Sequence, residues 1–151
     1  MKNIDSSISD QDLISHLESN GDYRIIKKLK PQSQYNDDDG NPKGVAIFLD
    51  TETTGIDIAK DEIIELGMVA FEYSISTGKI FKILETFNEL EEPKVVISKE
   101  ASEVNGITME MVKGHKIDNE AVEAFINQAG IILAHNAKFD RQFVEKRFSF
   151  F

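Results

Sequence analysis

Two acidic residues follow an apolar run near the middle of the chain, in the segment IFLDTETTG. The run Ile47–Leu49 is typical of a buried strand, and Asp50 and Glu52 come directly after it, two positions apart. Because strand side chains alternate between faces with period two, both carboxylates leave the backbone on the same side, with α-carbons roughly 6.5 Å apart. Two carboxylates placed in this way repel each other unless a cation lies between them.

A third carboxylate, Asp140, follows a second short apolar run, Ile131–Ala134. Ligands of α/β proteins gather beyond the carboxyl ends of strands, so the three acids converge if the two strands are parallel neighbours. An oxygen-only cluster suits Mg²⁺ or Mn²⁺, which complete their shells with water and substrate phosphate. Two such ions can activate a water and stabilise the leaving oxygen during attack on phosphorus.

Each of these features also has a purely structural interpretation. Asp50 and Glu52 alone fit a solvated strand edge, and Asp140 alone fits an acid in the first turn of a helix. His135 alone is typical of a hydrogen-bonded histidine near a strand end, and residues 53–55 alone fit a turn. The order and sum of the features, rather than any one of them, carry the functional prediction.

The bulk composition predicts a globular protein of modest size. The chain has 151 residues, of which 40% are apolar, and a net charge of −10. This charge argues against a broad basic face for nucleic acid but leaves room for acidic groups that bind cations. There is no apolar run of the roughly 20 residues that a membrane span needs, and the N-terminus is polar. Together with the absence of cysteine, these features predict a cytoplasmic protein without a membrane partner.

Residues 1–43 are expected to form a small N-terminal extension. Ser9 or Asp10 can cap a helix that ends near Asn20, a short strand is expected over residues 23–29, and residues 36–42 have the composition of an acidic linker.

Residues 44–151 have the pattern of an α/β domain. Short connections between the first three strands predict an antiparallel meander, and the fourth apolar run predicts a buried, parallel strand. The expected strands cover residues 45–49, 62–73, 80–87 and 131–134, and the expected helices cover 98–104, 108–113 and 120–129 and begin again near 138. Phenylalanines at the end of the last helix predict an exposed apolar surface that packs on further protein, for example in a homodimer.

Four segments resemble the DnaQ-like branch of the DEDD exonuclease superfamily, which contains the proofreading (epsilon) subunit of bacterial DNA polymerase III. The segment Phe48–Gly55 is similar to the first exonuclease motif, and Leu133–Asp140 is similar to the second. The segments Asp61–Gly67 and Val104–Thr108 match between them, in the family's order. The resemblance covers residues 45–148.

The resemblance implies a ribonuclease-H-like fold, a mixed sheet flanked by helices, and two-metal 3′-to-5′ hydrolysis at nucleic-acid ends. Asp50, Glu52 and Asp140 are then the catalytic residues and the ligands of two Mg²⁺ or Mn²⁺ ions. The substrate-binding residues that it implies are Thr53, Thr54, Ile56, His135 and Asn136. The implied partners are nucleic-acid 3′ ends, single-stranded by preference, and a DNA polymerase in replication. DNA is the expected substrate, but the motifs address the phosphate and the strand end, so they leave RNA open as the alternative.

The family's third motif has no counterpart in the 151 residues. That motif supplies a fourth metal-binding aspartate and the histidine or tyrosine that acts as general base. The sequence therefore predicts an exonuclease domain that lacks its C-terminal part and hydrolyses poorly by itself, because a general base typically contributes ~10²–10⁴-fold in rate. The alternative is a non-catalytic module that binds nucleic acid or protein on the same fold.

Overall fold

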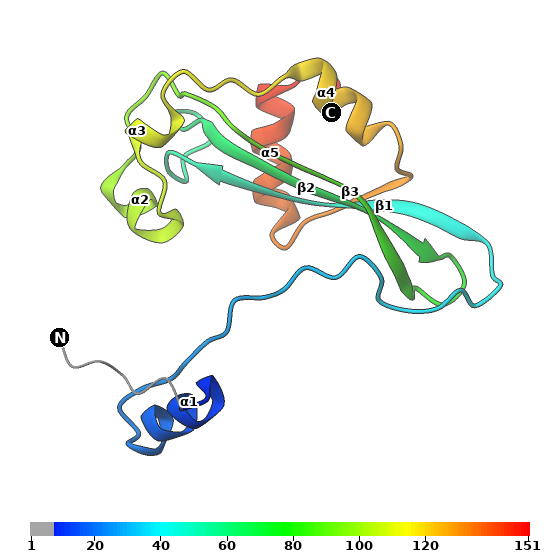
Figure 1. The fold of residues 1–151 in the computed structure, drawn as a ribbon. Helices are drawn as coiled ribbons and strands as arrows, with labels where there is room; N and C mark the ends of the chain where they lie inside the picture. The colour runs from blue at the N-terminus through cyan, green and yellow to red at the C-terminus, as the bar shows by residue number, and fades with distance from the viewer. Residues whose placement is uncertain (1–7) are drawn as a thin grey trace. The chain divides into compact units, whose positions relative to one another are not determined.

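The chain forms two units, each compact in itself. The computed structural model describes residues 8–151, and contacts divide the chain into Met1–Pro31 and Gln32–Phe151 (Figure 1). The larger unit therefore begins before the predicted position at residue 44. Its first residues run along the third strand of the sheet, where the Tyr35 N–H donates to the Phe81 carbonyl at 2.7 Å and the Ile83 N–H donates to the Ser33 carbonyl at 2.9 Å.

The smaller unit contains one helix, α1 (Asp10–Ser19). The side chain of Ser9 accepts a hydrogen bond from the Asp12 N–H at 3.2 Å and caps its first turn, as the sequence predicted. No residue of α1 is buried. The short strand predicted over residues 23–29 is not formed, because no strand within residues 8–151 lies beside this segment for its backbone to pair with.

The larger unit is built on a four-stranded mixed sheet in the order β3-β2-β1-β4. Its strands are β1 (Lys43–Thr53), β2 (Ile63–Ser74), β3 (Ile80–Leu90) and β4 (Ile131–Leu133). β1, β2 and β3 form an antiparallel meander, and β4 runs parallel to β1, with Phe48 beside Leu133. The predicted mixed sheet and its strand directions are confirmed.

β1 is longer than the predicted strand over residues 45–49. Its pairing with β2 continues past Leu49 to Thr53, which lies opposite Ile63 after a shift in register. Asp50 and Glu52 therefore belong to a paired strand in the middle of the sheet, and their backbone is fixed on the β2 side.

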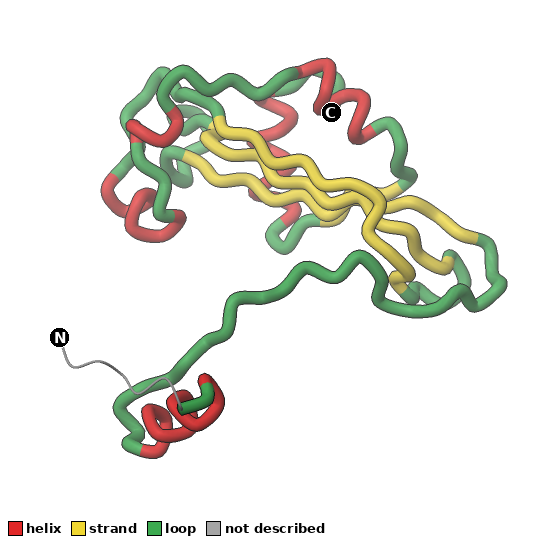
Figure 2. The backbone as a smooth tube through the Cα atoms, in the orientation of Figure 1, coloured by secondary structure: helices red, strands yellow, loops and turns green. Residues whose placement is uncertain are grey.

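Two helices cover one face of the sheet (Figures 1 and 2). They are α4 (Asn119–Ile126), capped by Asp118 as predicted, and α5 (Ala137–Arg147). Their apolar side chains pack on those of the first two strands in one core. The buried members of this core are Ile47, Leu49, Ile63, Leu66, Met68, Ala70, Ile117, Val122, Phe125, Phe143, Val144 and Phe148.

Two short helices lie beside the start of β2 and the end of β3 (Figure 1). α2 (Lys99–Asn105) begins at Ser98, whose side chain accepts from the Ala101 N–H, and ends at Gly106 in the left-handed conformation, with φ of 75°. α3 (Met109–Val112) follows it. Ile64, Ile97, Ile107 and Val112 form their small core.

The structure corrects two expectations about burial. β4 is exposed rather than buried, with 46%, 41% and 39% of Ile131, Ile132 and Leu133 accessible, because it lies at the edge of the sheet with β1 as its one neighbour. The C-terminal helix is packed rather than exposed: Phe143 and Phe148 are 2% accessible, and Phe150 and Phe151 pack against the same core. The exposed surface proposed for a homodimer is therefore absent from this helix.

None of the helices in residues 8–151 combines the length and the apolar character that a membrane span requires.

Candidate active site

The two faces of β1 carry different chemistry. Leu49, Thr51 and Thr53 are buried toward α5, whereas Phe48 and Asp50 are exposed and Glu52 is half-buried on the opposite face. Period-two alternation alone accounts for this division. Asp50 and Glu52 therefore share one face of the sheet, as the sequence predicted.

Asp140 reaches the same end of β1 from the first turn of α5. Its side chain is 4% accessible, and its Oδ1 atom accepts hydrogen bonds from the Thr51 N–H at 3.1 Å and from the Thr51 hydroxyl at 2.9 Å. β4 pairs with β1 only as far as Phe48, so the backbone of Thr51 is open to this contact. Oδ1 is thus fixed to the residue between Asp50 and Glu52, while no hydrogen bond within the described residues uses Oδ2.

The carboxylates at this end of the sheet repel one another. Partial loss of hydration raises the pKa of Asp50, and the charges of Asp140 and Glu65 raise it further, while nearby His135 lowers it. Partial loss of hydration also raises the pKa of Glu52, and the charge of Asp50 adds to this rise. This repulsion is what a cation would relieve.

Glu65 is an acidic neighbour that the sequence analysis did not assign to the site. It lies directly opposite Glu52 across the β1–β2 pair, and the Asn88 side chain of β3 donates to its Oε1 atom at 2.9 Å. The alternation of β2 marks Glu65 as outward-facing, but only the pairing register places it beside Glu52. Like charges directly opposite each other on a sheet destabilise the sheet. The charge of Glu65 also raises the pKa of both Asp50 and Glu52, so it adds to the negative potential of the site.

Asn105, the last residue of α2, is a second residue that the sequence analysis left without a role. Its side chain lies near the carboxylate of Glu52 and lowers the pKa of that group, while its Oδ1 atom accepts from the Ile107 N–H at 2.9 Å. Asn105 lies in the segment Val104–Thr108, which resembles the exonuclease family. Its position beside Glu52, however, depends on how α2 packs.

The donor set at this end of the sheet suits a divalent cation of the Mg²⁺ type. Asp50 and Glu52 present carboxylate oxygens on one face, and Asp140 has one oxygen fixed and one without a hydrogen bond. All of these donors are oxygen atoms, which hard cations prefer. In residues 8–151, however, no three acidic or histidine side chains already stand close enough together to enclose an ion.

The loop after β1 is held by a network of hydrogen bonds centred on Asp61. Its Oδ1 atom accepts from the Thr54 hydroxyl at 2.8 Å, and its Oδ2 atom accepts from the Asp57 N–H at 2.7 Å. A methyl carbon on Gly55 would lie 2.5 Å from Asp61 Oδ2, so this position requires glycine for space. From α5, Lys146 Nζ donates to the carbonyls of Ile58 and Asp61, both at 2.8 Å.

This loop presents one large apolar side chain to solvent. Ile56 is 87% accessible, whereas Thr54 is fully buried with its hydroxyl used inside the loop. Thr53 is also buried, and its hydroxyl donates to the Gly55 carbonyl at 2.5 Å. A ligand can therefore meet the side chain of Ile56, but not that of Thr54.

His135 and Asn136 lie between β4 and α5. His135 is exposed and lines the same open depression on the sheet as Asp50, with Gly67 and Asn88 on its far side. Asn136 precedes α5, and its carbonyl accepts from the N–H groups of Phe139 and Asp140 at 2.7 Å and 3.3 Å. The structure thus brings His135 close to Asp50 and uses the backbone of Asn136 to begin the helix that carries Asp140.

A mixed sheet with an acidic pair on its first strand and a third acid on a helix at the same end defines a DnaQ-like exonuclease domain. The model of the exonuclease family (RNase_T) matches residues 47–151. The chain therefore belongs to the RNase_T exonuclease family.

Its similar proteins include much longer chains. The PolC-type DNA polymerase III of Thermotoga maritima is 35% identical over 122 residues, which are 80% of this chain and 8% of that protein. The DNA polymerase III subunit epsilon of Aquifex aeolicus is 30% identical over 105 residues, which are 68% of this chain and 48% of that protein. The chain thus spans less than a tenth of the PolC-type relatives and about half of the epsilon subunit.

Solved structures show the same fold. Escherichia coli Exonuclease I in complex with a 5cy-dA13 oligonucleotide has a TM-score of 0.52 and 19% identity, covering 66% of this chain and 22% of that one.

Proposed function

We propose that this domain is a metal-dependent 3′-to-5′ exonuclease that acts on DNA ends. The observation that carries the proposal is the pair of hydrogen bonds that Thr51, the residue between Asp50 and Glu52, donates to the carboxylate of Asp140. It fixes a third carboxylate at the end of the strand that already presents two. In the proposal these three acids hold two divalent cations, Mg²⁺ or Mn²⁺.

Each residue of the proposed site has a distinct role in binding the metal ions or the nucleic acid. Bound cations supply a water of lowered pKa and positive charge at the phosphate. Asp50, Glu52 and Asp140 hold them, and Thr51 keeps Asp140 in place. Ile56 contacts the terminal nucleotide, with the backbone of Thr53 and Thr54 beside it, while His135 and Asn136 form the wall on the β4 side.

The relatives support DNA as the substrate and a DNA polymerase as the partner. Their names are DNA polymerase III of the PolC type and DNA polymerase III subunit epsilon. We propose proofreading during replication in the cytoplasm, with a preference for single-stranded 3′ ends.

The 151-residue polypeptide is proposed to be a weak enzyme by itself. The only acid after Asp140 is Glu145, which is on the exposed side of α5 and pairs with Arg141 at 2.6 Å. It is therefore already engaged away from the site. Without a fourth acidic ligand and a general base, we expect rates ~10²–10⁴-fold below those of a complete site.

Metal binding tests this proposal independently of the rate. In isothermal titration with Mn²⁺ we expect wild type to bind and Asp50→Asn to bind far more weakly, because one carboxylate has been removed from the centre of the site. Asp57→Asn is the matched control, since Asp57 is an exposed acid paired with Lys60 at 2.9 Å. If Asp50→Asn bound Mn²⁺ as tightly as wild type, the proposal would be wrong.

Hydrolysis provides the second measurement. With excess protein, Mn²⁺ and a 5′-labelled single strand, we expect slow shortening that stops at a 3′-terminal phosphorothioate and is lost in Asp50→Asn. Shortening of equal rate in both proteins would indicate a contaminating nuclease and would contradict the assignment of Asp50.

One observation favours a non-catalytic binding module as the second candidate. No three acidic or histidine side chains in the described part of the chain already enclose a metal position. Such a module would bind DNA in EDTA as tightly as in Mn²⁺, and Asp50→Asn would strengthen its binding by removing a negative charge. The exonuclease proposal gives the opposite result in Mn²⁺.

A further inference from the structure

The segment Tyr23–Lys30 concentrates positive charge in an acidic protein. It holds four of the 17 lysines and arginines and no acid. Residues 32–151, by contrast, hold 12 lysines and arginines against 22 acids, which is a net charge of −10. The net charge of the unit that carries the proposed site is therefore repulsive toward a polyanion.

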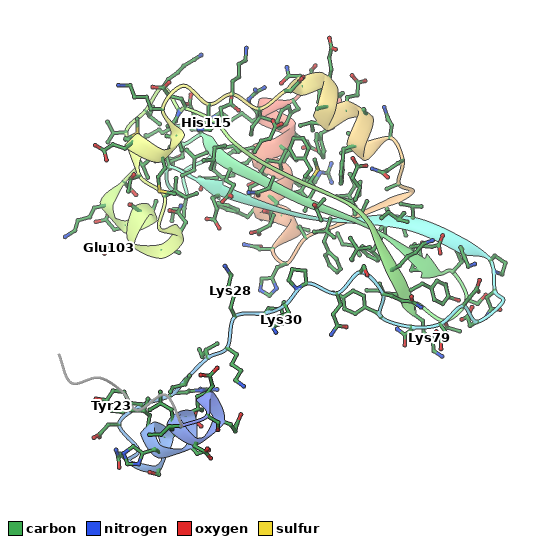
Figure 3. All side chains as sticks on the ribbon, in the orientation of Figure 1. Tyr23, Lys28, Lys30, Lys79, Glu103 and His115 are labelled. Atoms are coloured by element: carbon green, nitrogen blue, oxygen red, sulfur yellow. The ribbon has the colours of Figure 1, made fainter. Side chains whose placement is uncertain are left out.

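The four basic side chains of the segment are Arg24, Lys27, Lys28 and Lys30, and all of them are exposed. Within residues 8–151 none of them forms an ion pair with an acid. Figure 3 shows Lys28 and Lys30 projecting from an extended stretch of chain. Their charge is thus available to a partner.

Large apolar side chains are interleaved with these cations. Tyr23 is 59%, Ile26 84% and Leu29 87% accessible. The segment has no helix or strand of its own, so it does not offer the amphipathic helix by which proteins lie on membranes. Positive charge along the chain and an aromatic side chain are features by which proteins bind single-stranded nucleic acid, through phosphates and base stacking.

Two hydrogen bonds join the segment Tyr23–Lys30 to α1. The Ile25 N–H donates to Glu18 at 3.2 Å, and Lys27 Nζ donates to Gln11 at 3.4 Å. Alongside these bonds, the side chains of Tyr23 and Lys28 remain exposed.

We propose that residues 23–30 form a phosphate-binding arm that grips single-stranded DNA outside the hydrolytic site. The proposal rests on the proposed function, since it takes the substrate of that site as the polyanion. The arm supplies the electrostatic attraction that residues 32–151 lack. It addresses the backbone of the strand, so it binds without sequence preference.

Anisotropy of a fluorescein-labelled oligothymidylate in EDTA, between 50 and 200 mM salt, tests the arm with the whole chain. We expect a fourfold variant (Arg24→Gln, Lys27→Gln, Lys28→Gln, Lys30→Gln) to bind at least tenfold more weakly at low salt. Its salt slope is expected to fall by up to about 2.8, from about 0.7 for each phosphate contact. Tyr23→Leu is expected to lose affinity several-fold and Tyr23→Phe to retain it, because the phenyl ring still stacks.

The matched control changes four exposed lysines of the other unit, as Lys79→Gln, Lys94→Gln, Lys113→Gln and Lys116→Gln. It has the same net charge as the arm variant, so the proposal expects a much smaller loss. Equal losses in the two variants would overturn the proposal, since net charge alone would then explain them. It would also be overturned if wild type bound phosphatidylserine vesicles or an acidic protein but not DNA.

Failure of the arm and failure of the exonuclease can be told apart. DNA binding in EDTA needs neither metal nor hydrolysis. If the arm variant lost DNA affinity as expected but wild type did not bind Mn²⁺, the exonuclease proposal alone would be contradicted. Normal Mn²⁺-dependent shortening with unchanged binding in the arm variant would remove the arm alone. Circular dichroism checks that the variants fold, which is expected because no altered side chain is in either core.

Discussion

At the scale of single residues, the middle member of the Asp50–Thr51–Glu52 segment is as important as the two acids. Thr51 points to the opposite face of β1 and binds Asp140 through both its N–H and its hydroxyl. One strand thereby presents two carboxylates and positions a third from a residue that is 89 positions away in the sequence. The cost is electrostatic. After partial loss of hydration, the charge of Asp140 raises the pKa of Asp50, and the charge of Asp50 raises the pKa of Glu52.

Replacement of Asp50 should therefore stabilise the metal-free protein. The pKa of Asp50 is raised above its ordinary value of 3.8. A group whose pKa is raised in the folded state contributes stability below its unfolded pKa and loses it as the pH rises through the folded pKa. At pH 7 in EDTA the ionised group destabilises the fold, so Asp50→Asn should unfold at a higher temperature than wild type, and the gap should close toward pH 3.

Differential scanning calorimetry measures this effect. Asp57→Asn is the control, because an ion pair with Lys60 lowers the pKa of Asp57, and its loss should give no rise in unfolding temperature. Addition of Mn²⁺ should raise the unfolding temperature of wild type and leave Asp50→Asn nearly unchanged. A lower unfolding temperature for Asp50→Asn in EDTA would show that Asp50 is not under net repulsion.

At the scale of elements, helices deliver polar groups to the end of β1 from opposite faces of the sheet. α5 brings Asp140 and, through Lys146, fixes the loop that carries Ile56. α2 brings Asn105 to Glu52. Ser98 caps the N-terminus of α2, and Gly106 caps its C-terminus. These caps stabilise the helix that carries Asn105.

The cap of α2 gives a prediction with an internal control. Ser98 accepts from the Ala101 N–H at 3.0 Å, so Ser98→Ala should lower the free energy of unfolding by ~1 kcal/mol. Thr108 precedes α3 but makes no side-chain cap bond, so Thr108→Ala should cost less. Urea titration of both variants measures the difference. Equal losses would mean that the Ser98 hydroxyl has no capping role.

At the scale of the whole molecule, a neutral N-terminal unit is joined to a strongly acidic catalytic unit. Residues 1–31 hold five lysines and arginines and five acids, and contacts separate them from Gln32–Phe151. Within the described residues, no member of either core of the larger unit comes from residues 8–31. Its stability should therefore not depend on the N-terminal residues.

Deletion of residues 1–31 should leave the larger unit folded. We expect its unfolding temperature to stay within about 2–4 °C of that of the whole chain, which corresponds to at most ~1 kcal/mol for a domain of this size. Mn²⁺ binding should also persist, while DNA affinity in EDTA should fall. Calorimetry and titration of the deletion variant measure these quantities. A loss of cooperative unfolding would show that the two units fold together.

The sequence by itself determined the order and type of the strands and helices of the larger unit, and it singled out the three acids of the proposed site. Apolar runs and period-two alternation predicted β1 to β4, and Ser98 and Asp118 marked the starts of two helices, because these signals are local. The family segments predicted Asp50, Glu52 and Asp140 as the acids of the proposed site. The strand predicted over residues 23–29 failed because apolar and basic alternation does not form a strand without a neighbour.

Only the tertiary structure decided which of these residues meet. The β1–β2 register set Glu65 opposite Glu52, the packing of α2 brought Asn105 to the same carboxylate, and the short β4 left Thr51 open to Asp140. It also buried the phenylalanines of the C-terminal helix and exposed β4. Register, edge position and packing are relations between distant segments, so no local pattern contains them.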